Sequence, residues 1–313
     1  MENPGRSACP HFDALIEAAG AWEPVPAAIV HPCDEPSLRG AVEAARGNLI
    51  RPILVGPRQR IRRVAEQTGI VIDDFQLEDT AHSHASAARA VALARAGAVG
   101  MLVKGALHTD ELISEVLDRG SGLRTERRLS HVFALDVPTY AKLLFLTDGA
   151  INIAPDLQDK RDIVQNAIDL ARAAGIGTPR VAILSAVETV NPRIASTVDA
   201  AALCKMADRG QISGGLMDGP LAFDNAVSAD AAAIKGIHSR VAGDADILVV
   251  PDLMSGNMLA KQLVYLAAAK SSGIALGARV PIALTSRSDG VLSRVVSCAL
   301  ARSSMRNRTF DVS

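Results

Sequence analysis

Short apolar runs alternate with longer amphipathic stretches along the whole chain. The short runs are rich in β-branched residues, and several are apolar at every position, which is typical of strands buried on both faces of a mostly parallel sheet. We predict strands at residues 27–31, 52–55, 100–103, 131–135, 143–147, 181–185, 247–250 and 280–285.

The amphipathic stretches carry the polar residues and glycines that begin and end helices. These signals delimit a helix from Asp156 to Gly175, one from a capping-box-like start at 196–199 to Gly210, one from 255–257 to Gly273, and a last one capped by Ser288 or Asp289. The polar tail after Ala301 is expected to fray.

Strands that alternate with helices predict α/β layers joined by right-handed crossovers. A single sheet would be large for 313 residues, so we expect two domains of roughly 150 residues each. No linker sequence marks the junction, which we place near 147–150, with a return of the chain to the first domain near 277–281. The predicted domains are residues 1–147 plus 279–313, and residues 148–278.

Composition narrows the class of protein. Apolar residues make up 49% of the chain and aromatic residues 3%, which argues against intrinsic disorder and against an all-β sandwich. The formal net charge of −1 favours neither nucleic acid nor an anionic membrane as a partner. The four cysteines lie far apart, and the sequence has neither a secretory signal nor an apolar window of roughly 18 residues. We expect a reduced cytoplasmic protein with no metal site.

The common local motifs for nucleotide sites and for nucleophilic serines are missing from the sequence. Lys104-Gly105 follows a predicted strand, at the edge where α/β folds bind ligands; a solvated lysine at a turn is the alternative. In residues 120–131 a glycine-rich turn leads to three arginines, among them Arg127 and Arg128. These arginines either hold an anion or pair with local acids.

A further glycine-rich segment spans residues 213–226. We expect it to be irregular and to approach a ligand closely, with an ordinary turn as the alternative. Its candidate binding residues are Gly214, Gly215, Asp218 and Gly219.

Residues 281–290, PIALTSRSDG, bring three hydroxyls and an arginine to the amino end of a predicted helix. The free N–H groups and the dipole of that end favour an anion, and serine and arginine side chains add donors to it. Helix capping by Ser288 or Asp289 needs neither Ser286 nor Arg287. We therefore predict an anion site in this loop.

From about residue 97 to residue 301 the chain resembles the phosphate acetyl/butyryl transferase family. The resemblance rests on the stretches MLVKG, RRLSHVFALDVPTYAKLLFLTDGAINIAPDLQDKRDIVQNAI, AALCKMADRGQISGG, MDGPLAFDNAVS, GDADILVVPDLMSGNMLAKQL and PIALTSRSDG. It implies reversible transfer of a short acyl group between phosphate and the thiol of coenzyme A, without a tightly bound cofactor. It also implies two three-layer α/β domains of the isocitrate/isopropylmalate dehydrogenase type, a cleft between them and a homodimer whose contact lies on the second domain.

The resemblance also assigns residues. Ser286 and Arg287 match the catalytic Ser-Arg pair of the family, and a phosphate-binding arginine of the family matches Arg127 or Arg128. The acetyltransferase branch has an aspartate seven residues after the serine, where this chain has Ser293. Asp289, three residues after the serine, matches the SRxD wording of the butyryl type, which leaves the identity of the general base open.

The resulting hypothesis is direct transfer in a ternary complex, with acetyl preferred over butyryl. Arg287 binds phosphate and the oxyanion charge, Ser286 donates a hydrogen bond near the carbonyl, and Asp289 is the base or orients Arg287. Lys104, Asp218 and the glycines beside it line the substrate site. The alternatives are a phosphate butyryltransferase, a fold-related oxidoreductase and a non-catalytic protein that binds coenzyme A or an acyl phosphate.

Overall fold

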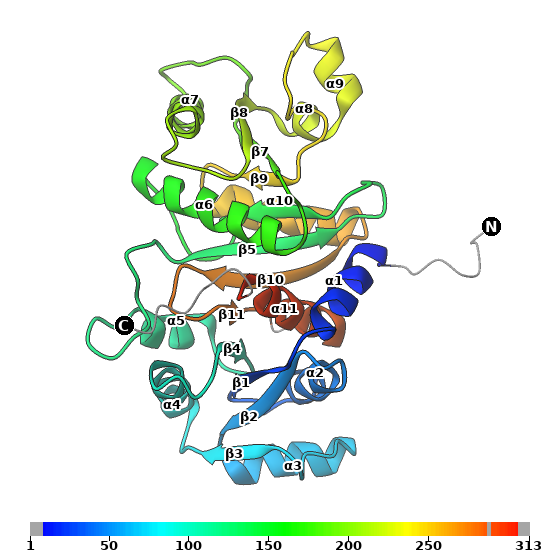
Figure 1. Ribbon diagram of the computed structural model, residues 1–313, viewed down its shortest axis with the longest axis vertical. Helices are drawn as coiled ribbons and strands as arrows, with labels where there is room; N and C mark the ends of the chain where they lie inside the picture. The colour runs from blue at the N-terminus through cyan, green and yellow to red at the C-terminus, as the bar shows by residue number, and fades with distance from the viewer. Residues whose placement is uncertain (1–8, 287–288, 306–313) are drawn as a thin grey trace, which may run out of the picture. The chain divides into compact units, whose positions relative to one another are not determined.

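The computed structural model describes residues 9–286 and 289–305 (Figure 1). The chain has a mixed α/β architecture, as the alternating pattern predicts. It divides into two compact units: Met1–Arg127 with Ser272–Ser313, called unit 1, and Arg128–Ser271, called unit 2. The junction expected near 147–150 falls within unit 2 and the return expected near 277–281 falls within unit 1, and the domain bounds drawn from the sequence stay a prediction.

The strands of unit 1 follow the order β3-β2-β1-β4-β11-β10. Neighbouring strands are parallel except for β10, which runs antiparallel to β11. The strands are β1 (Val25–Val30), β2 (Ile50–Gly56), β3 (Gln76–Asp79), β4 (Met101–Lys104), β10 (Lys270–Leu276) and β11 (Ile282–Ala283).

Helices cover both faces of these strands. In Figure 1, α1, α2 and α11 gather on one side of the sheet, and α4 and α5 lie on the other. The apolar positions between the layers are almost completely buried, for example Ile29, Leu54 and Leu102 at 0% exposure. The helices are α1 (Pro10–Gly20), α2 (Glu35–Arg46), α3 (Arg58–Thr68), α4 (Ser83–Arg95), α5 (Thr109–Leu117) and α11 (Val291–Ser304).

Unit 2 has the strand order β5-β6-β9-β7-β8, with β5 antiparallel to β6 and the remaining pairs parallel. Strand side chains alternate between two layers: Leu144 and Leu146 join the core against α10, while Phe145 is buried on the opposite face. Its elements are β5 (Ser130–Asp136), β6 (Leu144–Thr147), α6 (Leu157–Ala173), β7 (Arg180–Leu184), α7 (Ala195–Asp208), β8 (Leu216–Leu221), α8 (Phe223–Val227), α9 (Ala229–Ile234), β9 (Ile247–Val249) and α10 (Leu253–Leu266).

All eight predicted strands are present, and no strand end differs from the prediction by more than two residues. The strand β11 is two residues shorter than expected at both ends. Three strands were not predicted. β3 is polar, β8 contains Gly219 and Pro220, and β10 begins with Lys270-Ser271-Ser272 and follows closely on a helix. The expected helix from 255–257 to Gly273 is therefore wrong at its end, because α10 ends at Leu266 and the chain continues as β10.

The predicted helix starts have mixed outcomes. Asp156 caps α6 as predicted, accepting the N–H of Asp159 at 2.8 Å. The capping box at 196–199 is wrong: α7 begins at Ala195, and its N-cap residue is Ile194, whose side chain cannot accept a hydrogen bond. The tail also begins later than expected, because α11 continues to Ser304.

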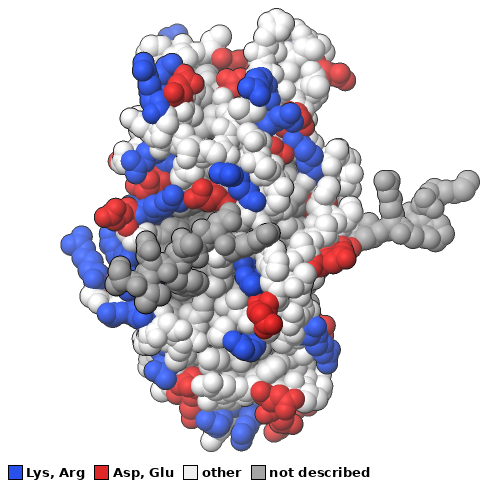
Figure 2. Space-filling view, viewed as in Figure 1, with Lys and Arg blue, Asp and Glu red and all other residues white. Residues whose placement is uncertain are grey.

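Positive and negative side chains are mixed on the surface, as the formal net charge of −1 leads one to expect. Figure 2 shows Lys and Arg side chains interspersed with Asp and Glu on the face in view. In the part of the chain that the structure describes, no helix is both long and apolar enough to cross a membrane.

Candidate active site

The carboxyl ends of the central strands of unit 1 meet at one edge of the sheet. Ala283 of β11 pairs with Val103 of β4, and Val30 of β1 pairs with Lys104. Because these strands are parallel, the chain leaves each of them on the same side. The structure therefore brings the end of β4 next to the loop that connects β11 to α11.

Lys104 is only 2% exposed, which rules out the solvated lysine that the sequence left as an alternative. Its Nζ lies 3.4 Å from the carbonyl oxygen of Gly105. A Cβ atom at residue 105 would lie 2.4 Å from the carbonyl oxygen of Val30, so only glycine allows this turn. The lysine ammonium is held at the carboxyl edge of β4 rather than in bulk water.

Two hydrogen bonds join Ser286 and Asp289, a pair that we call the Ser286–Asp289 turn. The backbone N–H of Ser286 donates to Asp289 Oδ2 at 2.7 Å, and the N–H of Asp289 donates to the carbonyl oxygen of Ser286 at 3.2 Å. Arg287 and Ser288 lie outside the described residues. The expected capping of α11 by Asp289 is wrong, because the N-cap residue is Gly290 and the Asp289 carboxylate turns back to Ser286.

Burial raises the pKa of Asp289 above its ordinary value. The hydrogen bond from Ser286 and the nearby charges of Arg294 and Lys104 oppose that rise in pKa. A carboxyl group with a raised pKa next to cations is suited to accept a proton, which is what a thiol nucleophile requires of a base.

Arg294, the fourth residue of α11, belongs to this edge and was not among the residues predicted from the sequence. It is 3% exposed, and it donates from Nη1 to the carbonyl oxygen of Lys104 at 3.2 Å and from Nη2 to that of Ser286 at 3.5 Å. The available signal was its spacing from Cys298 and Ala301, both of which are buried on the same face of α11.

The two candidate phosphate-binding arginines fall in different units, Arg127 in unit 1 and Arg128 in unit 2. Arg128 Nε donates to Asn152 Oδ1 at 2.7 Å and lies 3.6 Å from an oxygen of Asp159. Arg128 therefore pairs with local groups, which is the alternative that the sequence left open for the arginines of residues 120–131. Arg127 is exposed, with its backbone N–H donating to Thr125 Oγ1 at 3.1 Å. Which of the two meets phosphate stays open.

The segment 213–226 is not irregular, since β8 occupies Leu216–Leu221 and α8 follows it. Gly214 has a φ of +87° and lies with Gly215 against α6, where a Cβ on Gly214 would be 2.7 Å from Arg172 Nη1. Gly219 packs against Ile183, and Asp218 accepts the N–H of Gly219 at 2.8 Å. Packing explains these glycines without a ligand, and their role in substrate binding stays a prediction.

A buried polar network joins the end of β6 to the start of β5 in unit 2. Asp148 is 3% exposed; its Oδ1 accepts the N–H groups of Ala150 and Ile151, and its Oδ2 accepts Asn152 Nδ2 at 2.6 Å. Asn152 Nδ2 also donates to the carbonyl oxygen of Leu129 at 2.9 Å. The carboxylate is saturated with donors, which indicates a structural role for Asp148.

The thiols are poorly suited to nucleophilic catalysis. Burial raises the pKa of Cys33 to about 11 and the pKa of Cys204 and Cys298 to about 12. A thiol protonated at neutral pH is a weak nucleophile. Among the described residues no group of three or more His, Cys, Asp or Glu side chains is arranged to hold a metal ion.

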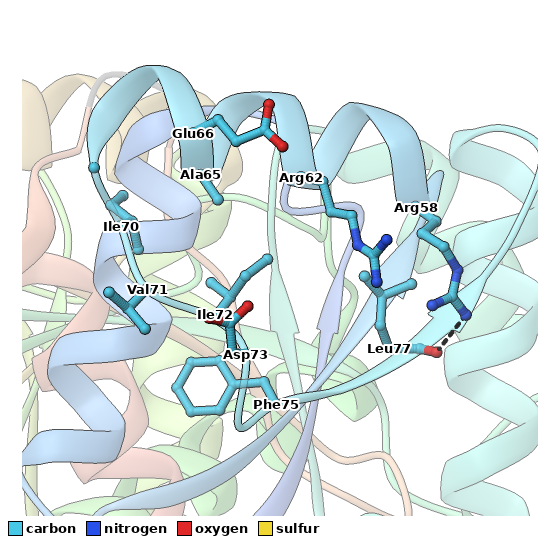
Figure 3. Close-up of a pocket in the computed structure, with 11 residues that line it drawn as sticks. Arg58, Arg62, Ala65, Glu66, Ile70, Val71, Ile72, Asp73, Phe75 and Leu77 are labelled. Carbon is cyan, nitrogen blue, oxygen red and sulfur yellow. Dashed lines mark hydrogen bonds between the residues drawn. The ribbon is translucent and has the colours of Figure 1, made fainter.

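A surface pocket of about 600 Å³ lies elsewhere in unit 1, between α3 and β3 (Figure 3). Arg58 and Arg62 extend from α3 toward Leu77, and Arg58 Nη2 reaches the Leu77 carbonyl oxygen at 3.4 Å. None of the described residues predicted for the site lines this pocket. It does not coincide with the Ser286–Asp289 turn.

The buried lysine and the Ser286–Asp289 turn lie in an α/β unit with helices on both faces of its sheet, and comparison with known proteins assigns the chain to a family. Residues 84–302 match the family described as "Phosphate acetyl/butaryl transferase". The chain belongs to the phosphate acetyl/butyryl transferase family.

Relatives in both branches of this family are similar to the chain. A phosphate acetyltransferase of Rhizobium meliloti is 60% identical over 290 residues, covering 93% of this chain and 92% of the relative. A phosphate butyryltransferase of Clostridium beijerinckii is 40% identical over 291 residues, covering 93% and 96%. The crystal structure of a branched-chain phosphotransacylase from Enterococcus faecalis V583 is 31% identical and superimposes with a TM-score of 0.78, covering 90% of this chain and all of the other.

Proposed function

We propose that the chain is a phosphate acetyltransferase, an acyltransferase that moves an acetyl group between coenzyme A and inorganic phosphate. The observation that carries this function is the 60% identity to a phosphate acetyltransferase over nearly the full length of both chains. A phosphate butyryltransferase is the second candidate, favoured by the 40% identity to that branch and by Asp289 at the third position after Ser286.

The proposed reaction is direct. In one direction the thiol sulfur of coenzyme A attacks the acyl carbonyl of the acyl phosphate, the C–O bond to phosphate breaks, and inorganic phosphate leaves. The thiol, whose ordinary pKa is roughly 8.5, loses its proton to a base. Both substrates react in a ternary complex, where positioning supplies much of the rate. The raised pKa values of the buried thiols support a route without a cysteine acyl-enzyme.

We assign the roles as follows. Arg287 compensates the charge of the phosphate and of the oxyanion, and the Ser286 hydroxyl donates a hydrogen bond near the carbonyl. Asp289 accepts the thiol proton, supported by its raised pKa and by its contact with Ser286. Lys104 adds positive charge at the same edge of unit 1.

We also propose a cytoplasmic homodimer that binds coenzyme A as a substrate and needs no tightly bound cofactor. Helix α10 supports the dimer, because Met254, Met258 and Tyr265 lie along one of its faces and are at least 60% exposed. Equilibrium sedimentation measures this state, and a monomer at micromolar concentration would contradict the dimer.

The experiment that tests the function is the release of free thiol from acetyl-CoA with and without added phosphate. We expect release only with phosphate, and a protein that merely binds coenzyme A would release none. Butyryl-CoA is the matched comparison. Acetyl and butyryl groups differ by two methylenes, worth roughly 1–2 kcal/mol in an apolar pocket, which corresponds to a factor of about 5 to 30 in kcat/KM. We expect acetyl-CoA to be the preferred substrate because the acetyltransferase relatives are the more similar ones. A preference of more than about tenfold for butyryl-CoA would assign the chain to the second candidate.

A further inference from the structure

Arg294 is a buried cation whose position needs a physical reason. It is only 3% exposed where α11 packs against α2, and the nearby carboxylates Asp34 and Asp289 act on it through their charges. Taking a guanidinium out of water is costly unless its donors are satisfied. Its Nε has no hydrogen-bond partner among the described residues. A core that only needed filling would be better served by an apolar side chain.

The two hydrogen bonds of Arg294 join segments that are far apart in sequence. Nη1 reaches the carbonyl oxygen of Lys104, 190 residues away, and Nη2 reaches the carbonyl oxygen of Ser286. Those carbonyls belong to the end of β4 and to the turn after β11. The planar fork of a guanidinium can hold two acceptors in a fixed relation, which a single ammonium cannot do.

The residues packed around Arg294 fix the position of its guanidinium group. Residue 40 on α2 is glycine, and a Cβ atom there would lie 2.9 Å from Arg294 Cδ and 3.0 Å from Arg294 Cβ. Asp34, which caps α2, and Asp289 are the acids whose charges act on the guanidinium, and Cys298 is the thiol nearest to it on α11. The stem of Arg294 therefore depends on the absence of a side chain at residue 40.

We propose that Arg294 is a positioning residue, which ties the Ser286–Asp289 turn to the carboxyl end of β4 and so holds the Ser286 hydroxyl, the Asp289 carboxylate and Lys104 in their reactive arrangement. This inference rests on the proposed function of the turn. Arg294 acts through its two carbonyl contacts and its charge, without touching substrate.

The charge of Arg294 has a separate consequence for Asp289. The groups that face the Asp289 carboxylate are the Ser286 N–H, Arg294 and Lys104. Removal of the Arg294 charge takes away one of the two cations that oppose the burial of this carboxylate, so the pKa of Asp289 rises further. A lysine at residue 294 keeps the charge but loses the fork.

The experiment compares Arg294→Met, Arg294→Lys and Gly40→Ala with Arg302→Met. Arg302 is the matched control: it lies on the same helix, donates to the carbonyl oxygen of Glu23 at 3.1 Å and stacks 5.1 Å from the centre of the Trp22 ring. We expect Arg294→Met to lower kcat on the order of 10- to 100-fold with the KM for acetyl-CoA little changed. Arg302→Met lowers the melting temperature and leaves kcat within about twofold.

The other two variants separate geometry from charge. Gly40→Ala keeps the guanidinium but displaces its stem, and we expect kcat to fall in the same direction as in Arg294→Met. The acid limb of the kcat profile moves to higher pH in Arg294→Met and stays in place in Arg294→Lys, whose kcat recovers only partly. Full kcat in folded Arg294→Lys, or kcat within about threefold of the parent in folded Arg294→Met, would overturn the proposal.

Amide hydrogen exchange keeps the proposal independent of the enzymatic assay. If the parent chain releases no thiol, the proposed function fails, and the exchange of peptide 281–290 still tests the link to Arg294. We expect faster exchange of this peptide in Arg294→Met and Gly40→Ala than in the parent and in Arg302→Met. Unchanged exchange in both site variants would show that Arg294 does not hold the turn.

Discussion

Asp148 and Asp289 have the same side chain but differ in burial and in the number of hydrogen bonds that they accept. Asp148 in unit 2 is 3% exposed and accepts hydrogen bonds from Ala150, Ile151 and Asn152. Asp289 in unit 1 is half-buried and accepts one described hydrogen bond, from the Ser286 N–H. The acceptor positions of the Asp148 carboxylate are occupied by hydrogen bonds from its own loop. The Asp289 carboxylate keeps acceptor positions that these described hydrogen bonds do not fill, and it lies near Lys104 and Arg294.

The two carboxylates show which positions of an α/β fold can carry out acid–base chemistry. A saturated carboxylate holds backbone in place, as Asp148 does for residues 150–152. A carboxylate whose burial is only partly compensated has a raised pKa and can take up a proton. The comparison predicts that changes near Asp289 act on rate and that changes near Asp148 act on stability.

Among the effects of Arg287, of pH and of chelators, the largest is expected from Arg287→Ala. A charge-assisted bidentate contact is worth roughly 1.5–3 kcal/mol, which corresponds to a loss on the order of 10- to 200-fold in rate. Arg287→Lys recovers only part of the loss, because an ammonium lacks the planar fork. Phosphate-dependent thiol release measures the rate, and thermal melting checks folding. A folded Arg287→Ala variant that stays within about threefold of the parent would show that the loop carries no anion site.

A smaller effect is expected on the melting temperature, through the titration of Asp289. Because burial raises the pKa of Asp289 above 3.8, the stability from its protonated form is present below pH 3.8 and is lost as pH rises through the folded pKa. Because asparagine does not ionise, Asp289→Asn does not lose stability as the pH rises. We expect the variant and the parent to melt together below pH 3.8, and the variant to melt higher at neutral pH. An Asp289→Asn variant that melts lower than the parent at neutral pH, and only there, would mean that ionised Asp289 stabilises the fold.

The smallest effect is expected from chelators. The sequence contains no paired cysteines or histidine pattern, and we expect treatment with a chelator to leave phosphate-dependent thiol release unchanged. Elemental analysis is the companion measurement. A stoichiometric metal ion that leaves the protein together with its activity would contradict this expectation.

Local pattern was enough to predict the central strands and the position of the loop after β11, because both depend on consecutive residues. The role of that loop as an anion site stays a prediction. The apolar runs at Ile29, Leu102 and Leu146 are buried strands, and Ser286 with Asp289 forms a turn at the carboxyl edge. β3 and β8 were missed because polar residues, glycine and proline at the edges of a sheet lack the apolar signature of a strand. Their pairing partners decide their structure.

Long-range contacts explain what the sequence could not predict about the site. Arg294 meets Lys104 across 190 residues, and Asn152 joins Leu129, Asp148 and Arg128. No local spacing encodes such contacts. The same holds for Asp289, whose sequence suggests a helix cap and whose carboxylate instead faces Ser286.

The different roles of the two aspartates are tested by measuring kcat and melting temperature for Asp289→Asn and Asp148→Asn side by side. An amide at residue 148 turns an NH₂ group toward the donors of Asn152, which costs about 1–3 kcal/mol of stability, and the folded variant keeps a kcat close to that of the parent. We expect Asp289→Asn to lose roughly 100-fold or more in kcat without melting lower at neutral pH. Full kcat in Asp289→Asn, with a loss of kcat and an unchanged melting temperature in Asp148→Asn, would contradict these roles.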